Sequence, residues 1–326
     1  MSTTVAPDRI LKELAALWVE EGKQGATGVL RACSMTLIVI AEERADTSEL
    51  GETIAALMPE HPARAILVRV RAGSERALSE RVYQQCWMPF GQRRQICCEQ
   101  IELTASDAAL GDLPSVLLPL IVADLPVIVW CRSPRLVPMP EFAQIGRLAD
   151  KVILDSAQFE RPAEGLGEIT RAQQGGLRIA DLAWTRLTRY REMLARVFEN
   201  REYFKGLPGI ETVSVACAPG YETAGLYMAA WVRDVLAQAG VSVKARASRG
   251  AATLSVELAS PDLRVLLKRE ADRLVVNVGD LSYCTHLAPS TDYLLMREEL
   301  RIVRRDTLFE RTLSTAAQLA LSSPGV

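Results

Sequence analysis

Residues 35–70 read MTLIVIAEERADTSELGETIAALMPEHPARAILVRV, and this stretch decides the fold of the first half of the chain. Met35 to Ile40 is almost wholly apolar, as is typical of a strand that is buried on both faces. Ser48 to Met58 has the apolar spacing of a helix, and Ala65 to Val70 is a second buried strand. This order predicts two parallel strands joined by a helical crossover.

The same alternation continues on both sides of this stretch. An amphipathic helix is expected to begin near Pro7, which suits a first helical turn. The later segments are expected as extended runs over 81–88 and 95–103, a short helix around 117–121, a strand over 127–130, a helix over 141–149 and a strand over 152–154. We therefore predict an α/β fold class, with a Rossmann-like domain over residues 1–160: a mostly parallel sheet with helices on both faces.

The pattern changes after a stretch rich in Gly, Gln and Ala, and we expect residues 161–182 to be a linker or crossover. Residues 183–326 then predict an α+β domain. It should begin with a helix over 184–198, followed by a strand over 212–217 and a helix over 223–239. Short strands separated by turn signals predict an antiparallel meander over 242–287, and one or two helices should close the domain over 292–320.

Composition and charge exclude some classes of function. The 326 residues are 49% hydrophobic and 24% charged, which fits a globular protein with a full core, and the net charge of −2 removes the broad electrostatic case for nucleic acid. The apolar stretch from Leu113 to Trp130 is interrupted by prolines, so we expect no membrane span. The N-terminus lacks the pattern of an export signal, and seven cysteines without framework spacing favour a reducing compartment. We predict a cytoplasmic protein.

A search for catalytic chemistry finds no persuasive arrangement. His61 precedes a proline and favours a structural role, whereas Cys284 and His286 share one strand face without a second ligand pair. The adjacent Cys97 and Cys98 should point to opposite faces of a strand, one in the core and the other exposed or facing a helix. The glycine motifs that bind nucleotides, G-x-G-x-x-G and G-x-x-x-x-G-K-[ST], do not occur in the sequence. We therefore predict no catalytic residue, no metal and no cofactor.

Two strand-end loops are candidates for holding a phosphate or another ligand. Asp155 and Ser156 follow a predicted strand, where sheets of this class bind ligands. Gly220 and Thr223 lie in the turn before a predicted helix, whose free N–H groups could hold an anion. Ordinary helix capping is the favoured explanation of the Gly220 turn, and an acidic residue after a strand often simply caps the next helix.

A third candidate is a helix rich in arginine. Trp184, Arg186, Arg189 and Arg191 are of residue types that often dominate protein interfaces or pair with acidic partners. We consider them as a partner-binding surface, with a core position for Trp184 as the alternative.

An ordered series of motifs resembles the OpcA family of glucose-6-phosphate dehydrogenase assembly proteins. The series comprises His61-Pro62-Ala63-Arg64, Cys98-Glu99-Gln100-Ile101, Ser115 to Leu120, Asp124 to Trp130, Asp155-Ser156 with Phe159, and Asp181 to Thr188 with Arg191. Cys131 and Tyr190 depart from the tryptophans expected in many relatives. The resemblance implies a non-catalytic assembly factor or allosteric activator that binds glucose-6-phosphate dehydrogenase in the oxidative pentose phosphate pathway, with no nucleic acid or membrane as partner.

Two other functions are consistent with the residues. The loops near Asp155 and Gly220 could serve a sugar-phosphate-binding enzyme or a metabolite sensor. The basic residues of the predicted meander, which include Arg246 and Arg269, could bind a phosphate backbone, although a solvated sheet face explains them as well.

Overall fold

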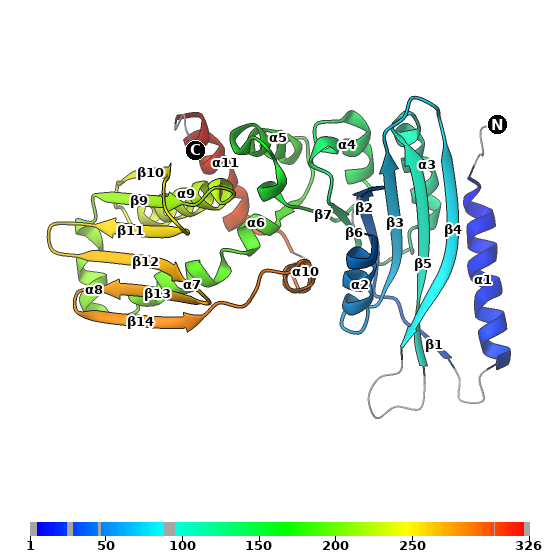
Figure 1. The fold of residues 1–326 in the computed structure, drawn as a ribbon, viewed down its shortest axis with the longest axis horizontal. Helices are drawn as coiled ribbons and strands as arrows, with labels where there is room; N and C mark the ends of the chain where they lie inside the picture. The colour runs from blue at the N-terminus through cyan, green and yellow to red at the C-terminus, as the bar shows by residue number, and fades with distance from the viewer. Residues whose placement is uncertain (1–4, 25–28, 45–46, 88–94, 303, 323–326) are drawn as a thin grey trace. The chain divides into compact units, whose positions relative to one another are not determined.

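The computed structural model describes residues 5–24, 29–44, 47–87, 95–302 and 304–322 (Figure 1). Contacts group the chain into two compact units. The first unit comprises Met1–Leu154, Gly175–Ile179 and Asp292–Val303, and the second comprises Asp155–Gln174, Ala180–Thr291 and Arg304–Val326. The domain boundaries inferred from the sequence stay predictions. The stretch expected to be a linker or crossover holds a helix, α5 (Pro162–Gln174), and a short strand, β8 (Ile179–Asp181).

The first unit is built on a largely parallel sheet, as the sequence predicted. Its strand order is β1-β5-β3-β2-β6-β7-β8, and β4 pairs with β5. Apart from β8, the strands of this sheet are β1 (Val29–Arg31), β2 (Met35–Glu42), β3 (Ala63–Arg71), β4 (Leu78–Trp87), β5 (Gln95–Ser106), β6 (Val127–Cys131) and β7 (Lys151–Leu154). Ile38 lies opposite Ile66 on one side and Val129 on the other, both in parallel register, whereas β4 is antiparallel.

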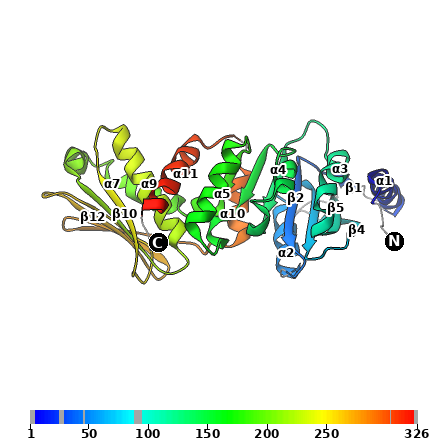
Figure 2. The ribbon, with the colours of Figure 1, turned by 90° about the horizontal axis from the view of Figure 1, so that it is seen from above.

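Helices cover both faces of this sheet (Figure 2). The helix α2 lies on one face, and α3 and α4 lie on the other, while α1 packs beside β4. The α-helices of the first unit are α1 (Pro7–Gln24), α2 (Thr47–Leu57), α3 (Leu113–Leu117), α4 (Pro140–Gly146) and α10 (Asp292–Leu300). The buried Lys151 donates to the carbonyl oxygens of Glu299 and Ile302, both at 2.9 Å, and to the Glu299 carboxylate, so one lysine fastens the late helix α10 to β7.

Coverage of both faces also explains the two adjacent cysteines. Cys97 and Cys98 are both fully buried, because each face of β5 is covered. Cys97 forms a disulfide with Cys86 on the neighbouring strand β4, which the expectation of a reducing compartment did not predict.

The second unit carries the mostly antiparallel sheet, in the order β10-β9-β11-β12-β13-β14. Its strands are β9 (Thr212–Cys217), β10 (Lys244–Arg249), β11 (Ser255–Ala259), β12 (Arg264–Glu270), β13 (Arg273–Val278) and β14 (Leu281–His286). The predicted meander is confirmed for β11 to β14 (Figure 1). It was wrong for the first strand of that series, because β10 pairs in parallel with β9 across the intervening helix α9.

The helices of the second unit complete its core. They are α5, α6 (Leu182–Thr185), α7 (Thr188–Val197), α8 (Arg201–Gly206), α9 (Glu222–Gln238) and α11 (Thr307–Ser322). The single helix predicted over 184–198 is two helices, α6 and α7, which meet at Arg186 and Leu187. Alternate residues of β9, namely Val213, Val215 and Cys217, are buried, whereas the residues between them are partly exposed, so one face of this sheet carries the core.

Candidate functional site

The structure brings the strand-end loop and the arginine helix together in the second unit. Asp155 directly follows β7, and its side chain is almost fully buried. Arg186, at the end of α6, donates from Nη1 to Oδ1 and from Nη2 to Oδ2 of Asp155, both at 2.7 Å. This bidentate pair joins two residues that the sequence placed in different candidate sites, and it satisfies most of the charge of each.

A second buried carboxylate, Asp181, ties the same region to α9. The backbone N–H groups of Ser156 and Ala183 each donate to its Oδ1 at 2.9 Å, and the Tyr227 hydroxyl donates to Oδ2 at 2.7 Å. Burial, together with the nearby charge of Asp155, raises the pKa of Asp181 to about 6. Thr223 donates to the Ser156 carbonyl oxygen at 3.3 Å, so α9 is also fixed to this loop. Asp155, Ser156 and Thr223 thus have structural partners within the fold.

Trp184 lies in the core, which decides between its two interpretations. It is 3% exposed, and its ring centroid lies 5.9 Å from that of Tyr227 and 6.0 Å from that of Phe309. Arg191 stacks over the indole at 3.5 Å and donates to the Trp184 carbonyl oxygen. Of the four residues considered for a partner surface, Arg189 has the most clearly exposed side chain: it is 64% exposed and pairs with Glu192 at 2.8 Å.

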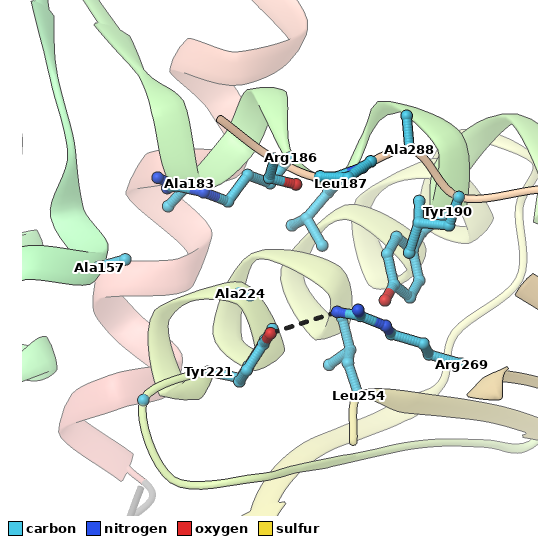
Figure 3. Close-up of a pocket in the computed structure, with 14 residues that line it drawn as sticks. Ala157, Ala183, Arg186, Leu187, Tyr190, Tyr221, Ala224, Leu254, Arg269 and Ala288 are labelled. Carbon is cyan, nitrogen blue, oxygen red and sulfur yellow. Dashed lines mark hydrogen bonds between the residues drawn. The ribbon is translucent and has the colours of Figure 1, made fainter. Parts of the chain in front are cut away.

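A cavity of about 400 Å³ opens beside this cluster within the second unit (Figure 3). Gly220, with a φ of +83°, forms its edge at the turn into α9. Arg186 and Arg269 line it together with Tyr190 and Tyr221, and apolar side chains such as that of Leu254 complete the wall. None of the described residues that line it is acidic.

The cavity contains residues that the sequence did not assign to a ligand site. Arg269 was visible only as one of several basic residues on a strand, and Tyr190 only as a departure from a family pattern. The turn at Gly220 did point to this place. Local sequence does not indicate that α7 and β12 lie on either side of one cavity.

The other predicted features stay separate from this cavity. Cys284 and His286 are both exposed on β14, and the described residues hold no group of three or more His, Cys, Asp or Glu side chains arranged for a metal ion. Within the described part of the chain, no helix is both long enough and apolar enough to span a bilayer.

The architecture is that of a two-unit protein: a Rossmann-like sheet, and an α+β unit with an inward-facing charge cluster and a donor-lined cavity. The family model described as the glucose-6-phosphate dehydrogenase subunit N-terminal domain matches residues 54–171, and the one for the C-terminal domain of that subunit matches residues 177–313. The chain belongs to this family, OpcA, which confirms the resemblance drawn from the ordered motifs.

Curated relatives agree with this assignment. A protein of Nostoc punctiforme is 25% identical over 267 residues, covering 80% of this chain and 54% of its own length. A protein of Synechocystis sp. is 29% identical over 201 residues, covering 60% of this chain and 41% of its own length. Both carry the provisional name OxPP cycle protein OpcA. The chain spans about half the length of the curated relatives it matches.

Solved structures whose chains follow a similar path include oxidoreductases. An NAD-binding oxidoreductase from Klebsiella pneumoniae has a TM-score of 0.49 at 11% identity, covering 90% of this chain and 96% of its own. A Gfo/Idh/MocA family oxidoreductase from Vibrio cholerae has a TM-score of 0.45 at 9% identity, covering 88% and 96%. Similarities at this level are too low to support an inference about the activity of this chain.

Proposed function

We propose that this chain is a non-catalytic, cytoplasmic partner of glucose-6-phosphate dehydrogenase that favours the active state of that enzyme. Membership of the OpcA family carries the proposal, because both family models are described as parts of a glucose-6-phosphate dehydrogenase subunit and together span most of the chain. The names of the relatives, which refer to the oxidative pentose phosphate cycle, support the same partner.

Acidic residues at the end of strand β2 in the first unit support a non-catalytic role. In Rossmann-like sheets, a dinucleotide lies at the carboxyl ends of the strands, over a glycine-rich turn. Here β2 ends at Glu42 and continues into Glu43 and Arg44, and Glu42 pairs with Arg135. Acidic side chains at that turn oppose a pyrophosphate, so we do not assign a nicotinamide cofactor to this sheet.

The proposed activation has a simple physical form. A protein that binds the active conformation or oligomer of the dehydrogenase more tightly than the inactive one shifts the population towards the active form. A tenfold preference corresponds to about 1.4 kcal/mol. A modest surface patch can supply such a difference.

Arg189 is the residue of the arginine helix that best suits a contact with this partner. Arg186 and Arg191 are held by Asp155 and by the indole of Trp184, whereas the Arg189 side chain extends from α7 beside Glu192. Reversing the charge of Arg186 would break an internal ion pair and confuse binding with folding. We therefore restrict the interface probe to Arg189.

Size-exclusion chromatography with light scattering tests this proposal. The chain and the dehydrogenase from the same organism should co-elute, and Arg189→Glu should weaken the complex about tenfold or more. Arg171→Glu is the matched control, because Arg171 is 68% exposed on α5 and pairs with Glu168 in the same helical spacing. Co-elution that is equally strong for both variants would remove Arg189 from the interface. No co-elution of the unaltered proteins would contradict the proposed partner.

A further inference from the structure

We propose that the cavity of the second unit binds a small phosphate monoester, with the phosphate between Arg269, Tyr190 and the first turn of α9. This inference concerns the isolated chain and does not depend on the proposed dehydrogenase partner. It rests on three features that the described residues give the cavity: an arginine without an acidic partner, a tyrosine hydroxyl that opens onto the cavity without a hydrogen bond, and an open helix N-terminus.

Arg269 is the first feature. Its Nε donates to the Ala271 carbonyl oxygen at 3.0 Å, and its Nη1 lies 3.4 Å from the Tyr221 hydroxyl (Figure 3). Among the described residues, no carboxylate lies within ion-pair distance of this guanidinium, whereas the other lining arginine, Arg186, is paired with Asp155. Arg269 therefore gives the cavity a positive charge that the fold leaves uncompensated.

Tyr190 is the second feature. It is 4% exposed and lines the cavity, and in the described part of the chain its hydroxyl has no hydrogen-bond partner. The hydroxyl oxygen itself is not sealed from solvent, so it opens onto the cavity and can donate to a ligand there. Burial raises the pKa of Tyr190 to about 12, which keeps this hydroxyl protonated and able to donate at neutral pH. Figure 3 shows Tyr190 and Arg269 facing the same space from α7 and β12.

The N-terminus of α9 is the third feature. Tyr221 occupies the N-cap position and makes no side-chain cap with the described residues of the first turn. The Tyr221 N–H donates to the Ala218 carbonyl oxygen at 3.1 Å, so it is the N–H groups of the turn after it, together with the helix dipole, that favour an anion. The acid of this turn, Glu222, does not line the cavity and is paired with Arg249 at 3.0 Å.

These three features, together with the cavity volume, favour a phosphate over a carboxylate and a small organic group over a large one. A guanidinium, two phenolic hydroxyls and backbone N–H groups offer more donors than a carboxylate can accept in one direction, and they suit the three terminal oxygens of a phosphate monoester. Apart from Arg186 and Ser290, the remaining wall is apolar and includes Leu187, Leu254 and Leu287. A volume of about 400 Å³ accommodates a compact metabolite, and the apolar wall predicts an organic group on the phosphate.

Isothermal titration calorimetry of the full chain with phenyl phosphate, inorganic phosphate and benzoate tests the inference. Phenyl phosphate should bind saturably and more tightly than either of the other two. Arg269→Gln should weaken its binding about tenfold or more, and Tyr190→Phe, which removes one oxygen, about fivefold. Arg273→Gln is the matched control, because Arg273 is exposed on the adjacent strand and does not line the cavity.

Circular dichroism melts should show all three variants folded, and Tyr190→Phe keeps the test usable if Arg269→Gln unfolds. Three results would overturn the inference: no saturable binding of phenyl phosphate, binding that neither Arg269→Gln nor Tyr190→Phe weakens, or benzoate binding as tightly as phenyl phosphate.

Discussion

Charged side chains at the carboxyl edge of the first sheet have partners of opposite charge within the fold, whereas one in the cavity of the second unit does not, among the described residues. At the sheet edge, Glu42 accepts from Arg135 Nε at 2.7 Å and from Nη2 at 3.0 Å, and Arg135 also pairs with Asp107 at 2.9 Å. In the cavity, the described residues give Arg269 no acidic partner. The edge where a Rossmann-like sheet would bind its ligand is closed by ion pairs, whereas the cavity keeps donors available.

This difference shows that the residue type alone does not mark a binding site. Asp155 and Arg186 looked like site residues in the sequence, yet each is the other's counter-ion. A charged group can bind an outside ligand only where the fold does not already supply the opposite charge. Substitutions in the two regions should therefore differ in size and in kind.

The largest effect is expected from Trp184→Ala. The change removes a buried indole packed between Tyr227 and Phe309, so the free energy of unfolding should fall by about 3–5 kcal/mol. Urea unfolding followed by circular dichroism measures this loss, with Trp184→Phe as a milder control. A loss below about 1 kcal/mol would mean that the indole is not a core residue.

Of the substitutions, Asp155→Asn should have the next largest effect. It removes the buried carboxylate that pairs with the half-buried guanidinium of Arg186, which should lower the free energy of unfolding by about 2 kcal/mol. The same urea titration measures it. An unchanged free energy of unfolding would contradict the role of Asp155 as the structural partner of Arg186.

Asp181 predicts a pH dependence of stability. Its folded pKa of about 6 lies above the ordinary value for an aspartate, so the native state holds a proton that the unfolded chain has lost at that pH. The contribution is therefore fully present below about pH 4 and is lost as the pH rises through 6, by about 3 kcal/mol. Unfolding free energies of the unaltered chain relative to Asp181→Asn should decline over this interval. A difference that is flat between pH 4 and pH 7 would contradict the raised pKa.

Glu42→Gln should have the smallest effect, although it breaks the ion pair at the sheet edge. The side chains of Glu42 and Arg135 are each 37% exposed, so water screens the pair and the loss should stay below about 1 kcal/mol. A loss as large as that of Asp155→Asn would show that the two regions do not differ in the way described here.

The alternation of apolar runs was sufficient to predict most elements of the fold. The strands around Ile38, Ile66 and Val129 were found because strands buried on both faces are continuous apolar runs. The errors have local causes: one continuous amphipathic pattern hid the break at Arg186 and Leu187. The parallel pairing of β10 could not be predicted because strand length and turn signals do not specify which neighbour a strand takes.

The candidate site was predictable only in part. Asp155, Ser156, Arg186 and Thr223 were named from the sequence. The contacts of Asp155 with Arg186 and of Ser156 with Thr223 were not predicted, because these residues come from separate elements. Tyr190 and Arg269 became site residues only when α7 and β12 were placed around one cavity. Periodicity predicts which face of an element is buried, and it contains no information about which distant element covers that face.

The central claim is that this chain activates glucose-6-phosphate dehydrogenase by binding it. The most direct test measures the initial rate of the dehydrogenase from the same organism over a range of glucose 6-phosphate concentrations, with increasing amounts of this protein. We expect a saturable rise in kcat/KM that Arg189→Glu shifts to higher protein concentration and Arg171→Glu does not. A rate curve that is unchanged at every concentration of the added protein would contradict the claim.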